Sequence, residues 1–327
     1  MFKFRTWPVL ATGLLVLCAG SYAIADDDDD DDDDDDRISR WWGQYYGHDD
    51  DHDDDDDDDD DNDDVVDCDD GDSIQEELEE LDDDESVIGF TGTCVEDIDI
   101  STSGVTLRGT DPIRSFNVIQ GNITITGATG VELSNFTVDG TAVGRQVAVQ
   151  DGSFAMLTDM DLTRVHLTAN RNSGVSLLDS TILAALGDQA MEAFRNSLIR
   201  IENTTVTGAN TLAVQFGGHS YLHAVNSTLT TPNNDTALPV LRIFENSGAR
   251  FDGGTVTGVV VIQHRSTVNG YGSVPFNGNV ILRHGSALIG EPPPGDNRIR
   301  VNGNLFCFDD ESSVALVFSA PNNCGGF

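Results

Sequence analysis

Arginine and histidine recur at the two positions that directly precede a repeated serine in the second half of the chain. The basic residues at these positions are Arg171, Arg195, His219, His264, Arg265 and His284. Guanidinium and protonated imidazole groups bind carboxylates and sulfates through charge-assisted hydrogen bonds. The pattern therefore predicts that these six basic residues bind an anionic ligand. The alternative is that they are ordinary solvated turn residues.

The serines belong to a repeat that determines where the six basic residues lie. Successive members are 19 to 27 residues apart, and the series is Ser153, Ser173, Ser197, Ser220, Ser247, Ser266, Ser286 and, as its last member, Ser313. A second series stands three positions before an apolar residue and consists of Asn135, Asp159, Asp179, Asn203 and Asn226. Short polar residues that recur once per repeat are typical of turns, where they bond to the backbone and stack on their copies. Self-similarity at this period indicates a solenoid.

The content of each repeat predicts which solenoid forms. Each period holds several runs of three to five residues rich in Val, Ile, Leu, Thr and Phe, and leaves no room for a helix. The leucine-rich repeat pattern and the glycine-rich calcium-binding nonapeptide are absent. We therefore predict an all-β fold, a right-handed parallel β-helix of about 20–27 residues per coil, over residues 86–327. Stacked coils place equivalent side chains about 5 Å apart, so the six basic residues are expected to form a column along one edge.

Two stretches resemble a known superfamily. Residues 99–110 are DISTSGVTLRGT, and residues 121–140 are GNITITGATGVELSNFTVDG. They are similar to the opening coils of the pectate-lyase-like right-handed β-helix superfamily, and the similarity extends over residues 90–320. That superfamily includes lyases, glycosidases, esterases and non-enzymes, so the resemblance implies the architecture and leaves the activity open.

The resemblance also implies where catalytic groups would lie. Members that cut polyuronates use calcium with an Arg or Lys base, or clustered aspartates. The glycosidase motifs have their nearest counterparts in Gly187-Asp188-Gln189, Gly218-His219-Ser220 and Arg200-Ile201-Glu202, each of which lacks a residue that the chemistry needs. For a lyase, the base would be Arg171 or Arg195, and the calcium ligands would come from Asp159, Asp161, Asp188 and Glu192.

Asp188, Glu192 and Arg195 are the catalytic candidates that remain. Asp159 and Asp179 occupy the repeated polar position, so we expect them to stack in turns and not to bind a metal ion.

The first quarter of the chain has a different composition. Residues 1–25 have the basic start, apolar stretch and Ala23-Ile24-Ala25 cleavage site of a signal peptide, and the apolar stretch is too short to span a membrane. Residues 26–72 are predicted to be a disordered, aspartate-rich leader that repels itself and carries little apolar surface. Calcium would condense on it weakly, because six to eight oxygens must be held at 2.3–2.6 Å to form a defined site. An amphipathic pattern over residues 73–85 predicts a short helix that covers the first coil.

Four cysteines remain after signal cleavage, namely Cys68, Cys94, Cys307 and Cys324. An even number in an exported chain indicates disulfides, and three connectivities exist. Pairing in sequence order is favoured, because it closes one bridge at each end of the solenoid. A zinc site is disfavoured, because no two cysteines have the close spacing of zinc ligands.

The charge distribution excludes nucleic acid as a partner. Residues 26–90 hold 32 Asp and 5 Glu against two Arg, a net charge of −35, and residues 91–327 carry a net charge of −8. Phosphate neutralisation requires a basic stripe, which the sequence lacks. We predict a bacterial protein, secreted or periplasmic, that serves as a non-catalytic binding module for an anionic polysaccharide or envelope component. The alternative is a polysaccharide lyase or glycoside hydrolase acting on an anionic glycan.

Overall fold

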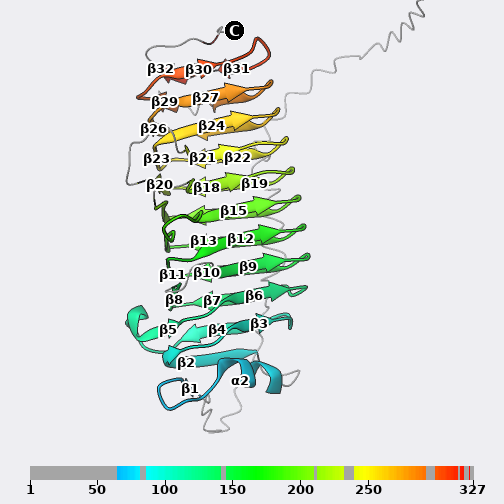
Figure 1. The fold of residues 1–327 in the computed structure, drawn as a ribbon, viewed down its shortest axis with the longest axis vertical. Coiled ribbons are helices and arrows are strands. Elements are labelled where there is room, and N and C mark those ends of the chain that lie inside the picture. Colours follow the sequence, from blue (N-terminus) through cyan, green and yellow to red (C-terminus); the bar gives the residue numbers. More distant parts are fainter. Residues whose placement is uncertain are drawn as a thin grey trace, which may run out of the picture. The chain divides into compact units, whose positions relative to one another are not determined.

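The computed structural model describes residues 65–81, 86–140, 145–209, 212–231, 239–291, 299–315, 317–319 and 324. These residues form a right-handed parallel β-helix of about 9 turns, as predicted, with coils stacked from β1 at one end to β32 at the other (Figure 1). The predicted signal peptide and the aspartate runs lie outside the described residues. Within the described ranges, no helix is long and apolar enough to cross a membrane.

Each coil contributes one strand to each of three parallel sheets. Sheet A contains β1 (Val66–Asp67), the first half of β2 (Val87–Cys94), β4 (Thr106–Gly109), β7 (Val131–Ser134), β10 (Phe154–Thr158), β13 (Gly174–Leu178), β16 (Leu198–Glu202), β19 (Tyr221–Val225), β22 (Gly248–Asp252), β25 (Thr267–Tyr271), β28 (Ala287–Glu291) and β31 (Ser313–Ala315). Sheet B contains the second half of β2, β5 (Asn117–Ile119), β8 (Thr137–Asp139), β11 (Asp161–Thr163), β14 (Thr181–Leu183), β17 (Thr205–Thr207), β20 (Thr228–Thr230), β23 (Thr255–Thr257), β26 (Pro275–Asn277), β29 (Ile299–Val301) and β32 (Val317–Ser319).

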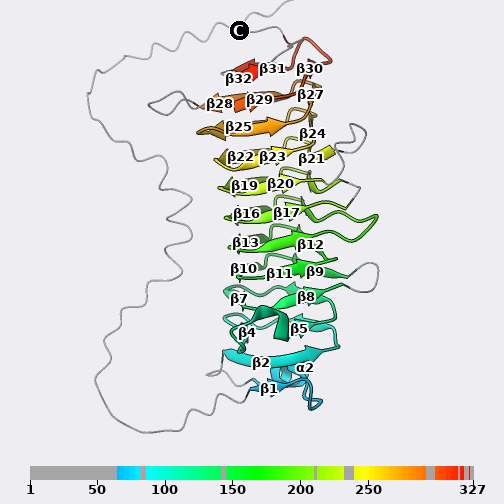
Figure 2. The ribbon, with the colours of Figure 1, turned by 90° about the vertical axis from the view of Figure 1, so that its left-hand side faces the viewer.

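Sheet C, the third wall, contains β3 (Ile98–Ile100), β6 (Ile123–Thr126), β9 (Gln146–Gln150), β12 (His166–Asn170), β15 (Met191–Phe194), β18 (Val214–Phe216), β21 (Pro239–Ile243), β24 (Val259–Gln263), β27 (Val280–Arg283) and β30 (Leu305–Cys307). The strands of sheets A and B follow one another along each coil in Figure 2. A short 3-10 helix, η1 (Arg114–Phe116), lies between β4 and β5.

The core fills the interior of the coils, because strands alternate buried and outward-facing side chains. The predicted apolar series is confirmed: Val138, Leu162, Ile182, Val206 and Leu229 are direct cross-strand partners on consecutive coils of sheet B. All five side chains are buried. The polar residues three positions earlier are also confirmed as turn residues, since each has a positive φ between 48° and 59°. Asn and Asp tolerate that left-handed conformation better than most residues.

The N-terminal end is covered as predicted, but with different boundaries. Helix α2 (Ile74–Glu80) is shorter than the predicted 73–85, and it buries Ile74 and Leu78. The side chain of Ser73 caps it, and Glu96 accepts hydrogen bonds from the backbone N–H of Ile74 and from the Ser73 hydroxyl. The predicted leader boundary at residue 72 also differs from the structure, because β1 already pairs with β2.

Both predicted disulfides are confirmed. Cys68 bonds to Cys94 with a Cα–Cα distance of 4.9 Å, and Cys307 bonds to Cys324 at 5.0 Å. The first ties the segment before α2 to β2, where β1 also pairs. Such bridges form and persist in oxidising compartments.

Candidate functional site

The six basic residues lie in the turns that join sheet C to sheet A. We call this line of turns the serine-turn edge; it comprises the two residues before each repeated serine. All six basic residues have positive φ, between 56° and 66°, so each turn is built from left-handed residues. Each turn stacks on the next through a backbone hydrogen bond, for example from Asn172 N–H to Arg195 O at 2.9 Å. The side chains at these positions therefore point outward in columns one coil apart.

The repeated serines hold the serine-turn edge from inside. Ser197 is 2% exposed; its hydroxyl donates to the carbonyl of Phe194 at 2.8 Å and accepts from the N–H of Ser173 at 3.3 Å. The other repeated serines are buried in the same way, which explains the repeat. The last member is Ser312 and not the predicted Ser313. Ser286 N–H bonds to the Ser312 hydroxyl, and Ser313 begins β31.

Four of the six basic residues line one hollow of about 770 Å³. They are His219, His264, Arg265 and His284. The rings of His264 and His284 stack with centroids 4.7 Å apart and planes 13° from parallel. The hollow is also lined by Gly218, Glu245, Asn246, Asp309 and Glu311. The predicted column is therefore not uniformly basic, because carboxylates stand among the basic side chains.

The remaining two basic residues lie outside this hollow. Arg171 forms an ion pair with Asp151 at 2.9 Å, one coil away. Arg195 is exposed, and its backbone nitrogen packs against Gly218 of the next coil, where an added β-carbon would stand 3.1 Å from it. Among the described residues, neither Arg195 nor Arg265 forms an ion pair. Both guanidinium groups are therefore available to an anion.

Asp309 closes the serine-turn edge at its C-terminal end. Its carboxylate accepts hydrogen bonds from the backbone N–H groups of His284, Gly285 and Ser312, and from the Ser312 hydroxyl. Burial acts to raise the pKa of Asp309, but these hydrogen bonds outweigh it and hold the pKa below its usual range. Because these hydrogen bonds occupy its oxygens, the Asp309 carboxylate stabilises the last turn and is poorly placed to bind a metal ion or a sugar.

The catalytic candidates are only partly brought together. Glu192 faces outward from sheet C, and its Oε1 lies 3.7 Å from Nε2 of His166 on β12. Asp188 lies in the turn before β15, and its negative charge acts to raise the pKa of His166. Arg195 lies beyond the end of β15, in the serine-turn edge. Asp188 and Glu192 thus converge on a histidine that the sequence analysis did not single out.

Burial shifts the pKa values of His166 and Glu192 in opposite directions. It lowers the pKa of His166, an effect that the negative charge of Asp188 opposes, and it raises the pKa of Glu192. Both shifts favour the neutral form, since the charged form loses hydration. An imidazole beside a carboxyl group is an arrangement that can accept and donate protons. His166 belongs to neither of the repeated series, so no pattern in the sequence pointed to it.

The other acidic candidates lie in turns or on another sheet. Asp159 and Asp179 lie in left-handed turns, as predicted, and Asn203 donates to Asp179 from the next coil at 3.1 Å. Asp161 lies on sheet B, where it accepts from the Thr181 hydroxyl. These residues do not share a face with Glu192 on sheet C.

The three segments that resemble glycosidase motifs do not form one site. Asp188 lies in a turn before β15, His219 lies in the serine-turn edge, and Arg200 lies on sheet A. Arg200 is paired with Glu202 at 2.8 Å. The geometry therefore gives no support to a hydrolase site built from these segments.

Sheet A carries a second charged row that the sequence analysis missed. Arg200, His223 and Arg250 are direct partners on consecutive coils. His223 and Arg250 both contact Asp252, at 2.6 and 2.8 Å. Burial acts to raise the pKa of Asp252, but these hydrogen bonds and positive charges outweigh it and lower the pKa. The basic side chains of this row are therefore paired with Glu202 and Asp252 within the protein.

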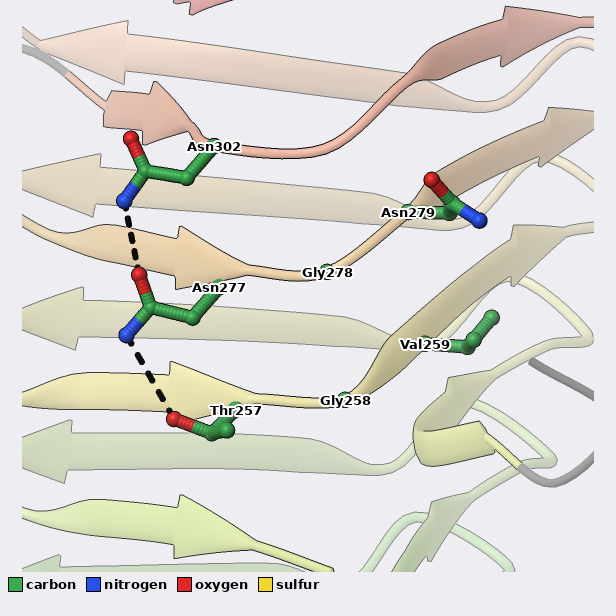
Figure 3. A pocket seen from close by; sticks show the side chains of 7 residues that line it. All are labelled: Thr257, Gly258, Val259, Asn277, Gly278, Asn279 and Asn302. Carbon is green, nitrogen blue, oxygen red and sulfur yellow. Dashed lines mark hydrogen bonds between the residues drawn. The ribbon is translucent and has the colours of Figure 1, made fainter. Parts of the chain in front are cut away.

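A second hollow, of about 400 Å³, lies where sheet B bends into sheet C (Figure 3). Its lining is uncharged, and Asn302 donates to Asn277 at 2.6 Å, which donates to Thr257 at 3.4 Å. These amides satisfy one another across three coils. The side chains that line this hollow are therefore part of the hydrogen-bonded stacks that join one turn to the next.

One group of described residues has metal-ligand atoms close together: Cys68, Cys94 and Glu96. The two sulfur atoms form a disulfide, and Glu96 holds the start of α2. That group is therefore structural. Comparison with protein-family models, with curated proteins and with solved structures found no match to this chain.

Proposed function

We propose that the protein is an exported, non-catalytic β-helix that binds an acidic polysaccharide along the serine-turn edge. The observation that carries the proposal is the 770 Å³ hollow, in which Arg265 and three histidines stand beside carboxylates and an amide. A sugar acid presents both a carboxylate and hydroxyl groups. Arg265 fits the carboxylate, whereas Glu245 and Asn246 fit hydroxyl donors.

The repeating architecture supports a polymeric ligand. Side chains at equivalent positions recur one coil apart, about 4.8 Å, so successive sugars meet successive turns. Arg195 extends the strip of available guanidinium groups beyond the hollow. The resemblance to pectate-lyase-like β-helices supports a glycan in the same sense. The N-terminal signal pattern and the two disulfides support secretion or a periplasmic location.

The test measures binding of polygalacturonate and alginate, with neutral dextran as the comparison. The variant Arg195→Asn/Arg265→Asn removes both guanidinium groups, and Asn already occupies left-handed positions of this edge. Loss of two charge-assisted contacts should weaken binding by at least about tenfold. The matched control is Arg164→Asn, which also has a positive φ but lies in a turn between sheets B and C. Equal affinities of wild type and double variant would refute the proposal.

A second candidate function is proton-transfer catalysis on a glycan at sheet C. The pair of His166 and Glu192 favours it, because opposed pKa shifts of neighbouring groups are typical of acid–base sites. The His166 imidazole would take a proton from the sugar ring, and the Glu192 carboxyl group would give one to the departing glycosidic oxygen.

The assay follows new reducing ends and unsaturated sugar products from the same acidic polysaccharides. Cleavage that Glu192→Gln abolishes would establish this activity. An absence of products after prolonged incubation with high protein concentrations would exclude these substrates and leave the binding function.

A further inference from the structure

Two histidines and a glutamate occupy the same turn position on three consecutive coils. Glu245, His264 and His284 each stand two residues before a repeated serine. Backbone hydrogen bonds align their coils, from Asn246 N–H to His264 O at 3.0 Å and from Arg265 N–H to His284 O at 2.9 Å. All three side chains are exposed and line the same hollow. Residues 91 to 244 contain no such run at this turn position, where Asp151, Arg171, Arg195 and Gly218 stand instead.

We propose that His264 and His284, with a carboxylate oxygen of Glu245, bind a divalent transition-metal ion of the zinc class. Imidazole nitrogen and carboxylate oxygen are ligands that zinc accepts, at about 2.0–2.2 Å, with water completing the coordination. Calcium is a poorer fit, because it takes six to eight oxygen ligands. The inference goes beyond polysaccharide binding and does not depend on it.

The stacked rings lie side by side on adjacent coils, and the ligand atoms of the three residues do not yet lie within 4.8 Å of one another. The ring centroids are 4.7 Å apart, so rotation of the exposed side chains about χ1 and χ2 can bring one nitrogen of each ring to a shared ion. Such rotation is inexpensive at a solvated surface. Asp309 is not needed as a ligand, because its carboxylate is occupied by backbone N–H groups.

The charges around the pair also attract a cation. The hollow is lined by Glu245, Asp309 and Glu311 against a single guanidinium, that of Arg265. A divalent ion would offset this excess of carboxylates.

The test titrates the full chain with zinc chloride and measures both heat and melting temperature. Aspartate runs elsewhere in the sequence also bind zinc, so the readout is the difference between variants. His264→Asn and His284→Asn remove one ligand each, and Asn keeps the left-handed backbone, as it does at Asn172 and Asn246. The matched control is His219→Asn, which lines the hollow but stands in the other column of the turn.

Zinc should raise the melting temperature of the wild type and of His219→Asn, because an ion that joins two coils binds the folded state preferentially. Either ligand variant should lose that rise and bind at least about tenfold more weakly in the tightest phase. Melting temperatures without metal should agree among the four proteins, which verifies folding. The same zinc response in the wild type and in the double variant His264→Asn/His284→Asn would overturn the proposal, as would an equal loss in His219→Asn.

Discussion

Replacement of Ser197 by alanine tests whether the buried serines hold the turns of the β-helix. The hydroxyl of Ser197 makes two hydrogen bonds, one to the Phe194 carbonyl at 2.8 Å and one from the Ser173 N–H at 3.3 Å. Alanine fits the same space and leaves no large cavity. The variant therefore isolates the loss of these two bonds at a side chain that is 2% exposed.

The magnitude follows from what the substitution leaves unsatisfied. A buried donor without a partner costs about 1–3 kcal/mol, and a lost hydrogen bond about 0.5–1.5 kcal/mol. The Ser173 N–H is the donor that loses its partner, and its bond to Ser197 is long, at 3.3 Å. The cost of leaving this donor unsatisfied is therefore expected in the lower half of the range of about 1–3 kcal/mol. We expect a loss of about 2–3 kcal/mol in the free energy of unfolding, equivalent to about 5–10 °C in melting temperature for a fold of this size.

Guanidinium unfolding followed by circular dichroism measures the global effect, and amide hydrogen exchange at Ser173 measures the local one. The exchange rate of that amide should rise in Ser197→Ala, because its acceptor is gone. The control is Ser115→Ala in η1, an exposed serine for which about 0.5 kcal/mol or less is expected. A loss below about 0.5 kcal/mol in Ser197→Ala, with Ser173 still protected, would refute the account of the serine repeat.

Three further predictions concern the ends and the sheet C pair. Replacing Cys68 and Cys94 by Ser should lower the free energy of unfolding by about 3–4 kcal/mol, measured by denaturant titration, because the bridge closes a loop of 26 residues. Deleting residues 26–64 should leave the melting temperature unchanged, since most of that segment is aspartate, which cannot add to a core; binding of acidic polysaccharide should improve if the segment competes for the basic residues. A lowered pKa means that folded His166 resists protonation, so stability should fall as pH drops from the ordinary value of 6.5 toward the folded pKa. Melting temperatures across this window should fall less in His166→Gln, and parallel curves would contradict the assignment.

Periodicity in the sequence was sufficient to predict the coil, because each coil repeats the same contacts. The apolar series of sheet B and the polar turn series are both spaced by whole coils, and both were found in register. The last serine was misplaced because Ser312 and Ser313 are adjacent and both fit the pattern. Only the pairing of Ser313 with Ala287 decides between them, since a slip by one residue exchanges inside and outside.

The sheet C pair could not be predicted in the same way. His166 and Glu192 are 26 residues apart and occupy adjacent strands at diagonal positions, since Glu192 pairs with Thr168. The turn between β14 and β15 is longer than that between β11 and β12, so the offset between their coils follows no period. Which outward side chains meet therefore depends on where each strand begins after its turn, and the repeat in the sequence does not give these strand boundaries.

Hydrogen bonds within the stacked turns separate the structural acids of this protein from those available for binding. Asp309 and Asp179 stand at the turns, as potential ligands would, but each hydrogen-bonds within its own stack. Glu245 stands at a turn as well, where its neighbours in the column are Gly218 and His264. The same distinction separates Arg171, which is paired, from Arg265, which is not paired among the described residues. Binding at the serine-turn edge is therefore expected where the described side chains form no ion pair or hydrogen bond within the stack, over the coils from Arg195 to His284.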